Sequence, residues 1–169
     1  MTYVSHYDSP LGGITMTSDG AALTGLWFDG QTYFPEGLPA GSHACTQAAG
    51  RVFAQAAEWL DVFFSGREPD FTPPLHPEGS DFRKAVWRIL LSIPRGQTLT
   101  YGEIAARIAG ERGLPRMSAQ AVGGAVGHNP ISIIIPCHRV IGSDGSLTGY
   151  AGGLERKRRL LELEGVLLS

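Results

Sequence analysis

Residues 68–81 read EPDFTPPLHPEGSD and contain four prolines, at positions 69, 73, 74 and 77. Proline fixes its own φ and has no backbone N–H to donate, so this stretch predicts a linker without regular structure. At its end, Ser80 and Asp81 can cap the start of a helix. A chain of 169 residues is long enough for one domain or two small ones. We therefore predict an N-terminal part, residues 1–79, and a C-terminal part, residues 80–169.

The two parts differ in charge. Before Ser80 there are two basic and nine acidic residues, a net charge of −7, and from Ser80 onward there are twelve basic and seven acidic residues, a net charge of +5. An excess of positive charge in one half is typical of proteins that bind nucleic acid or another polyanion. A solvated charge distribution without a partner explains the same numbers, so both interpretations stay open.

The composition is that of a globular protein, with 43% hydrophobic and 18% charged residues. The apolar runs are a few residues long, far below the roughly 20 residues that a membrane-spanning helix needs. The first residues carry no secretory pattern, and we expect a cytoplasmic protein without membrane contact. Cys45 and Cys137 do not make a disulfide framework, so we expect both thiols to be free.

The N-terminal part predicts a small sheet with a helix. The β-prone residues 13–17 and 23–28 are separated by Gly and Asp, which is the pattern of a hairpin within residues 11–28. In residues 48–64, apolar side chains recur at helical spacing. These are Val52, Ala56, Trp59, Leu60 and Phe63.

The C-terminal part begins with an amphipathic helix. A helix is expected after Ser80 because its apolar side chains share one face, and Pro94, Arg95 and Gly96 are expected to end it. The apolar side chains are Phe82, Val86, Ile89, Leu90 and Ile93.

Two shorter helices follow. Thr100 and Glu103 match the Thr-x-x-Glu capping box, so a helix is expected over residues 101–109. Ser118 can cap the next helix, which extends to about Val126. This pair suggests a DNA-binding helix-turn-helix motif, although any small helical hairpin gives the same pattern.

The segment 131–141, Ile-Ser-Ile-Ile-Ile-Pro-Cys-His-Arg-Val-Ile, carries the candidate chemistry. Its β-branched run predicts a buried strand that ends at Pro136 and leaves Cys137 accessible where the chain leaves the sheet. A cysteine becomes a nucleophile when basic or cationic groups stabilise its thiolate, and His138 and Arg139 follow directly. In an extended chain neighbouring side chains point to opposite faces, so His138 can serve Cys137 only at a bend or through a water. A buried structural cysteine is the alternative interpretation.

Six short motifs stand out in this half: residues 121–125 (AVGGA), 128–130 (HNP), 135–140 (IPCHRV), 150–154 (YAGGL), 160–161 (LL) and 164–165 (EG). Together they closely resemble the O6-alkylguanine-DNA alkyltransferases, also called methylated-DNA–protein-cysteine methyltransferases. The resemblance covers essentially all of residues 80–165, whereas the N-terminal part matches loosely. It implies DNA repair in which Cys137 irreversibly takes the alkyl group from O6-alkylguanine, and also from O4-alkylthymine, in double-stranded DNA.

The resemblance also implies roles for residues around Cys137. Glu164 orients His138, and His138 draws the proton from Cys137 through a water. Asn129 ties the recognition helix to the active-site loop. Tyr101 contacts the flipped nucleotide, with ordinary aromatic packing as the alternative. The residues assigned to the substrate pocket are Val140, Tyr150, Ala151 and Gly152.

For DNA, the resemblance implies that the helix-turn-helix enters the minor groove and inserts a side chain where the damaged nucleotide is flipped out. The arginine usual at this position is Gln120 here, and the preceding turn, residues 110–117, is longer than the family pattern. Either Gln120 is the inserted group, or Arg112 or Arg116 of the turn replaces it. The residues assigned to DNA contacts are Arg116, Ser118, Gln120, Ala121 and Arg139.

We thus expect an α+β protein, with an N-terminal small β-sheet and helix of ribonuclease H-like type and a C-terminal helical domain that holds the helix-turn-helix and the cysteine loop. We expect a monomer without cofactor or metal, because Cys45 with three histidines (His6, His43 and His76) is an uneven ligand set. A non-turnover binder of alkylated DNA is one alternative, but such relatives lack the cysteine. A cysteine hydrolase is the other, and it needs an oxyanion hole that nothing in the sequence indicates.

Overall fold

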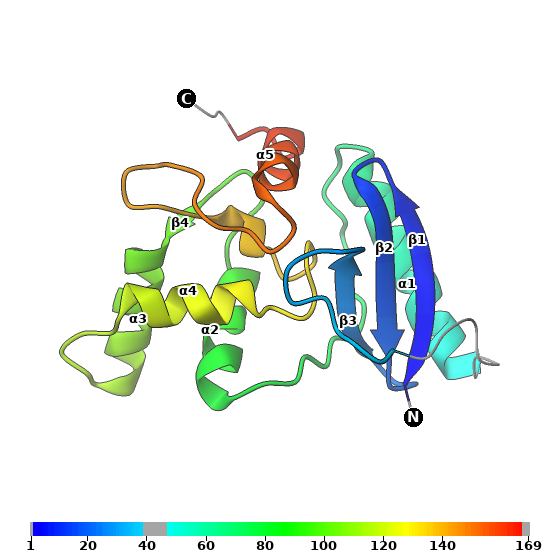
Figure 1. Cartoon of the computed structure of the whole chain (residues 1–169), viewed down its shortest axis with the longest axis horizontal. Coiled ribbons are helices and arrows are strands. Elements are labelled where there is room, and N and C mark those ends of the chain that lie inside the picture. Colours follow the sequence, from blue (N-terminus) through cyan, green and yellow to red (C-terminus); the bar gives the residue numbers. More distant parts are fainter. Residues whose placement is uncertain (1, 39–46, 167–169) are drawn as a thin grey trace. The chain divides into compact units, whose positions relative to one another are not determined.

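The structure, a computed structural model, describes residues 2–38 and 47–166 (Figure 1). It confirms the α+β class, since a sheet with one helix forms one compact unit and the other helices form a second. The first unit consists of the chain up to Glu78 together with Pro130–Ser132, and the second of Gly79–Asn129 with the chain from Ile133 onward. Three residues of the C-terminal half of the sequence therefore belong to the N-terminal unit.

A three-stranded antiparallel sheet forms the N-terminal unit, in the order β1 (Tyr3–Ser9), β2 (Gly12–Ser18) and β3 (Leu23–Phe28). The predicted hairpin is confirmed as β2 and β3, in which Ile14 lies opposite Phe28. The sequence did not predict β1, because most of its residues are half-buried or exposed and lack a continuous apolar signal.

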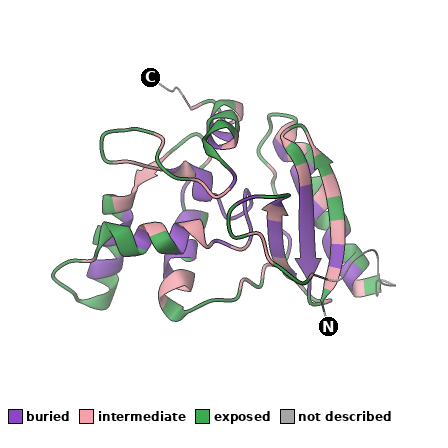
Figure 2. Ribbon diagram, in the orientation of Figure 1, coloured by how far each residue is buried: buried purple, intermediate pink, exposed green. Residues whose placement is uncertain are grey.

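Helix α1 (Gln47–Phe64) packs on this sheet. The five apolar residues predicted for its inner face are all buried, and β2 is buried along most of its length (Figure 2). Burial of a large apolar side chain contributes about 1.5–3 kcal/mol. The apolar face is therefore the main reason that α1 is held on the sheet.

The outer edge of β3 is covered by two short segments. Leu75 of the linker forms an isolated bridge to Leu23, so the linker is irregular as predicted but anchored at this point. Further along, Leu26 N donates to Pro130 O at 2.8 Å and Leu26 O accepts from Ser132 N at 2.9 Å. These bonds use backbone groups that an edge strand would otherwise leave unpaired.

The C-terminal unit begins with α2 (Asp81–Leu91), whose N-cap is Ser80 as predicted. A longer helix, α3 (Tyr101–Arg112), follows the two-residue strand β4 (Leu99–Thr100). The capping box is confirmed, because the Thr100 side chain accepts from Glu103 N at 3.0 Å and the Glu103 carboxylate accepts from Thr100 N at 3.1 Å. The helix extends beyond the predicted end at residue 109.

The predicted helix-turn-helix is formed by α3 and α4 (Ala119–Gly127). Gly113 ends α3 with φ of +65°, a left-handed conformation that glycine adopts without strain. Ser118 caps α4 by accepting from Ala121 N at 3.2 Å. The buried indole of Trp87 in α2 donates to Ala125 O at 2.9 Å, which anchors α4 to the core of the unit.

Two further elements complete the unit. Strand β5 (Val140–Ile141) pairs in parallel with β4, and helix α5 (Leu154–Leu163) follows a long loop. The sequence did not predict α5, because charged side chains dominate it and leave Leu160 and Leu161 as its main buried apolar residues. Within the described ranges, no helix is both long and apolar enough to cross a membrane.

Candidate active site

The prediction of a buried strand before Cys137 is wrong. Residues 131–135 form turns, of which only Ile131 makes a β-bridge. Ile133 has φ of +69°, a left-handed conformation that β-branched residues rarely adopt. The Asn129 side chain closes this loop, since its Nδ2 donates to Ile135 O at 2.8 Å. The β-branched run therefore predicted correctly that this segment is buried, but incorrectly that it is an extended strand.

Cys137 begins a short 3-10 helix, η1 (Cys137–Arg139). This turn supplies the bend that His138 needs if it is to serve the preceding cysteine. The sequence predicted an accessible thiol, but Cys137 is buried, with 4% of its surface exposed. A substrate can reach the sulfur only through a fitted pocket or after local movement.

His138 and Glu164 form a buried pair. The His138 Nε2 atom lies 2.9 Å from Glu164 Oε1, and both side chains are fully buried. Glu164 follows the last residue of α5, so this helix carries the carboxylate to the imidazole ring. The bond through Nε2 fixes the ring and makes Nδ1 the nitrogen that can exchange a proton.

A DNA contact requires an exposed guanidinium, but the guanidinium of Arg139 is bonded within the protein. Its Nε donates to both carboxylate oxygens of Glu164, at 3.0 and 3.1 Å, and Nη2 also bonds Oε2. Its Nη1 donates to Ile93 O, and 12% of the side chain is exposed. Because these bonds occupy the guanidinium, Arg139 holds the Glu164 carboxylate in place, and the DNA contact predicted for Arg139 stays a prediction.

These bonds set the charge states of the pair. Burial by itself would raise the pKa of Glu164, but hydrogen bonds from His138 and Arg139 lower it to about 2. Burial lowers the pKa of His138, while Glu164 acts in the opposite direction. At neutral pH the carboxylate is therefore ionised and the imidazole is neutral, which is the form that accepts a proton.

Burial raises the pKa of Cys137, and nearby polar groups oppose this effect. These groups are the Asn129 amide, the Lys157 ammonium and the Tyr150 hydroxyl. The resting thiol is protonated at neutral pH, so the reaction requires a base to remove its proton. Although His138 and Arg139 are adjacent in sequence, they do not keep Cys137 as a thiolate in the resting protein.

Lys157 is a site residue that the sequence analysis missed. It lies on α5, is fully buried, and donates from Nζ to Thr148 O at 3.0 Å and to Gly149 O at 3.1 Å. Burial lowers its pKa to about 8. Among the described residues no carboxylate forms an ion pair with it. In the sequence it stands among arginines in residues 156–159, and nothing distinguishes it from these exposed or half-buried neighbours.

Tyr101, at the start of α3, is joined to the same loop. Its hydroxyl donates to Thr148 O at 3.0 Å, so one carbonyl accepts from both Tyr101 and Lys157. Its ring lies beside α4, where a Cβ on Gly123 would be 3.9 Å from the ring. A Cβ at that distance would make an ordinary van der Waals contact, so the ring packs against α4 at position 123.

The residues predicted for the substrate pocket differ in burial. Val140 and Gly152 are buried, whereas Tyr150 and Ala151 are half-buried. Val140 directly follows η1 and is held by the pairing of β5 with β4. The Tyr150 hydroxyl is buried, and Cys137 is the neighbouring polar group that acts on it most strongly.

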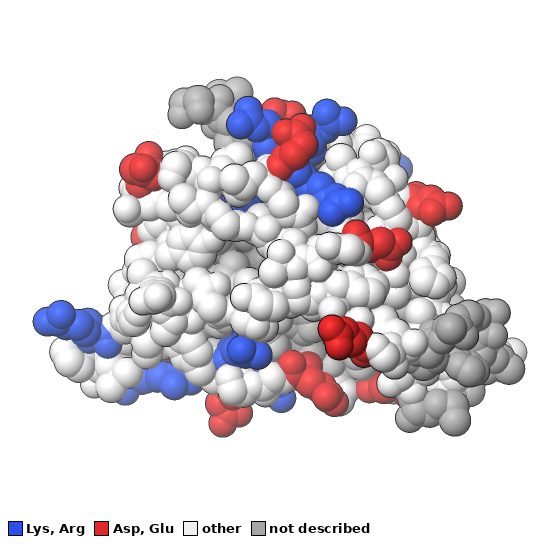
Figure 3. All heavy atoms as spheres, in the orientation of Figure 1, with Lys and Arg blue, Asp and Glu red and all other residues white. Residues whose placement is uncertain are grey.

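The residues predicted to contact DNA, apart from Arg139, lie at the start of α4 and in the turn before it. Ser118, Gln120, Ala121 and Arg116 are all exposed. Figure 3 shows basic side chains at the α3–α4 turn, where the chain has Arg112 and Arg116. Arg112, the other basic candidate, has its guanidinium carbon 5.4 Å from the centre of the Phe82 ring, a cation–π contact.

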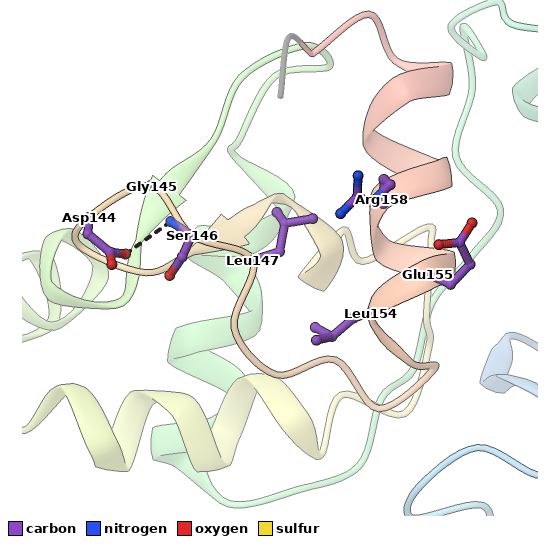
Figure 4. Close-up of a pocket in the computed structure, with 7 residues that line it drawn as sticks. All are labelled: Asp144, Gly145, Ser146, Leu147, Leu154, Glu155 and Arg158. Carbon is purple, nitrogen blue, oxygen red and sulfur yellow. Dashed lines mark hydrogen bonds between the residues drawn. The ribbon is translucent and has the colours of Figure 1, made fainter. Parts of the chain in front are cut away.

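A groove of about 440 Å³ lies between the 142–149 loop and the start of α5 (Figure 4). It contains none of the residues predicted for the site. In it, Asp144 accepts a hydrogen bond from Ser146 N at 3.0 Å. The groove is lined by Asp144, Gly145, Ser146, Leu147, Leu154, Glu155 and Arg158.

The described ranges contain no group of three His, Cys, Asp or Glu side chains arranged to hold a metal ion. His43 and Cys45, two members of the uneven ligand set considered from the sequence, lie outside the described residues.

Both units match known protein families. Residues 2–77 match the 6-O-methylguanine DNA methyltransferase, ribonuclease-like domain, and residues 81–166 match the 6-O-methylguanine DNA methyltransferase, DNA binding domain. The methylated-DNA–protein-cysteine methyltransferase of Mycobacterium tuberculosis is 47% identical over 162 residues, covering 94% of this chain and 92% of the relative. That of Haemophilus influenzae is 42% identical over 172 residues, covering 97% of this chain and 87% of the relative.

Solved structures agree with these matches. The O6-methylguanine methyltransferase of M. tuberculosis superposes with a TM-score of 0.77 at 44% identity, covering 97% of this chain and 93% of that one. A structure of the M. tuberculosis protein in complex with DNA gives a TM-score of 0.78 at 45% identity, covering 94% and 90% of the two chains.

Proposed function

The chain belongs to the family of methylated-DNA–protein-cysteine methyltransferases, and from this premise we propose that Cys137 is the residue that accepts the alkyl group. The activity is DNA repair by transfer of an alkyl group from O6-alkylguanine to the protein itself. The observation that supports Cys137 most directly is its place at the start of a turn whose next residue, His138, is bonded to the buried carboxylate of Glu164. Cys137 is the free cysteine within the described residues.

The proposed reaction is a nucleophilic substitution at the alkyl carbon. Neutral His138 takes the thiol proton of Cys137 through a water, and the ionised Glu164 stabilises the imidazolium that forms. The sulfur then bonds to the alkyl carbon, the bond from that carbon to O6 breaks, and its electron pair stays on guanine, which takes up a proton. Because a thioether forms, each molecule reacts once.

We propose that the DNA substrate is a duplex and that the damaged nucleotide leaves the base stack before transfer. The oxygen at position 6 lies on a stacked base, so a buried thiol can reach the alkyl carbon only after extrusion. The exposed residues Ser118, Gln120 and Ala121 at the start of α4 are proposed to contact the DNA, together with Arg116. Transfer from O4-alkylthymine, a monomeric state and a cytoplasmic location stay predictions.

Intact mass after incubation with a duplex oligonucleotide that contains one O6-methylguanine tests this assignment. We expect the protein to gain the mass of one methyl group and peptide mapping to locate it on Cys137. Cys137→Ser should abolish the gain and keep DNA binding, while Cys45→Ser serves as the matched control and should keep the gain. Product beyond one equivalent, or a methyl group on Cys45, contradicts the proposal.

A further inference from the structure

The buried hydroxyl of Tyr150 has no hydrogen-bond partner of good geometry among the residues that the structure describes. A buried unsatisfied donor costs about 1–3 kcal/mol, so such a group calls for a physical explanation. The backbone around it is firmly held. Lys157 bonds the carbonyls of Thr148 and Gly149, and Gly153 N donates to Tyr150 O at 2.9 Å. These bonds hold the backbone on both sides of Tyr150, whose hydroxyl is buried.

Cys137 acts more strongly on the buried Tyr150 phenol than any other side chain, and Tyr150 in turn favours the ionised form of Cys137. A neutral thiol is a weak hydrogen-bond acceptor, whereas a thiolate accepts strongly. The unsatisfied hydroxyl thus gains its partner when the sulfur becomes negatively charged.

We propose that the Tyr150 hydroxyl donates a hydrogen bond to the Cys137 sulfur as negative charge develops on it, and so acts as a catalytic residue that stabilises the thiolate. This role deepens the proposed function and rests on Cys137 being the acceptor. A donor fixed before the reaction stabilises the charge without rearranging, which is the principle of an oxyanion hole applied to sulfur. After transfer the sulfur is a thioether, a poor acceptor, and the hydroxyl loses its partner again.

Other groups also face the sulfur and must be separated from Tyr150 in any test. Lys157 approaches from α5 and Asn129 from the end of α4, and both favour the thiolate. Tyr101 of α3 interacts electrostatically with Cys137, but its hydroxyl donates to Thr148 O. His138 is the neighbouring base. Tyr150→Phe removes only the hydroxyl and leaves all four of these groups in place.

The experiment measures the rate of Cys137 alkylation by iodoacetamide in the full chain between about pH 6 and pH 10, a range that contains the ordinary cysteine pKa. Hydrogen bonds to charged groups are strong enough to move a pKa by about one unit or more. We therefore expect Tyr150→Phe to react about tenfold more slowly at pH 7, with a higher apparent pKa and a limiting rate at high pH that equals or exceeds that of the wild type. Site-specific fluorotyrosine at position 150, a stronger donor, should lower the apparent pKa.

Tyr7→Phe is the matched control, because it removes a phenol hydroxyl that donates to Asp61 in the other unit, at 2.6 Å, and should leave the profile unchanged. A wild-type apparent pKa in Tyr150→Phe overturns the proposal. So does a uniform loss of rate at all pH values, since that indicates a displaced thiol. If the wild type takes no methyl group from O6-methylguanine DNA, the proposed function fails separately, because iodoacetamide reports on the thiol without DNA.

Discussion

The Glu164 carboxylate is bonded to both the buried His138 and the half-buried Arg139, and these two bonds determine the charge state of His138. Arg139 and His138 together keep the carboxylate ionised, with a pKa of about 2. Arg139 also lowers the pKa of His138, in addition to the larger effect of burial. The imidazole therefore stays neutral at pH values where an exposed histidine would be partly protonated.

Removal of either member of the pair should change the pH dependence of alkyl transfer from free O6-benzylguanine. The wild type should keep substantial activity well below pH 8, because neutral His138 removes the thiol proton. In His138→Ala the rate should follow ionisation of the buried thiol and fall about tenfold for each pH unit below its raised pKa. Glu164→Gln should show a smaller change in the same direction, since it loses the charge that stabilises the imidazolium.

Glu162→Gln is the control for these measurements, because Glu162 is an exposed carboxylate on the same helix. Wild-type pH profiles in both His138→Ala and Glu164→Gln would show that the proton leaves Cys137 by another route.

Backbone strain at Ile133 gives a second prediction at the scale of single residues. Ile133 and Ile134 are both buried, but only Ile133 has a positive φ. A left-handed conformation costs a non-glycine residue about 1–2 kcal/mol, which glycine avoids. In chemical unfolding, Ile133→Gly should therefore destabilise the protein by about 1–2 kcal/mol less than Ile134→Gly. Equal losses of unfolding free energy would show that position 133 is not strained.

The residue types around Cys137 could be predicted from the sequence, but not their contacts. Cys137, His138 and Glu164 were identified together through the resemblance, and the hydrogen bond between His138 and Glu164 fits the predicted orientation. The environment of Arg139 and the burial of Lys157 depend on contacts across 25 and 8 or 9 residues of sequence. Neither the environment of Arg139 nor the burial of Lys157 produces a local sequence pattern. The sequence around an arginine or lysine does not show whether its side chain is buried or exposed.

At the scale of elements, α4 carries Gln120, at the position where the resemblance predicts an arginine. If Gln120 fills the space that a flipped nucleotide leaves, its side chain matters only when a base must be unstacked. Gln120→Ala should then slow transfer from duplex O6-methylguanine by about tenfold or more and leave the reaction with free O6-benzylguanine unchanged. Parallel rate measurements on the two substrates check this.

Arg112→Ala and Arg116→Ala, in or next to the turn before α4, provide the comparison. A wild-type duplex rate in Gln120→Ala together with a slow duplex rate in one of the arginine variants would transfer the role to that arginine. Arg112 is the weaker candidate, because its guanidinium already lies over the Phe82 ring.

Elements with a local signal were predicted well. The caps at Ser80, Thr100 and Ser118 are side-chain bonds to backbone three residues on, so the sequence alone specifies where α2, α3 and α4 begin. Helix α5 has no side-chain cap, and the run before Cys137 is bent by the Asn129 bond. In both places tertiary contacts, rather than propensity, determine the backbone.

At the scale of the whole molecule, Pro130–Ser132 belong to the N-terminal unit although α4 and Cys137 on either side of them belong to the other. Hydrogen exchange can measure how far the conformation of Pro130–Ser132 depends on their bonds to β3. In the full chain the Ser132 amide should be protected by its bond to Leu26 O. In a fragment of residues 79–169 that amide should exchange as fast as an unstructured one, because its acceptor is gone.

The Cys137 amide is the internal control, since its bond to Ile135 O lies within the fragment. It should remain protected, as should the amides of α4. Protection of Ser132 in the fragment would show that the segment keeps its conformation without β3.

The burial of Cys137 also governs how long an unused molecule keeps its capacity to react. A protein that is consumed by one reaction has no turnover with which to replace a thiol lost to peroxide. Oxidation to sulfenic acid requires both an exposed sulfur and a populated thiolate. With 4% of the residue exposed and the pKa raised by burial, both are scarce in the resting state. The burial of Cys137 therefore also slows the oxidation of its thiol in the resting protein.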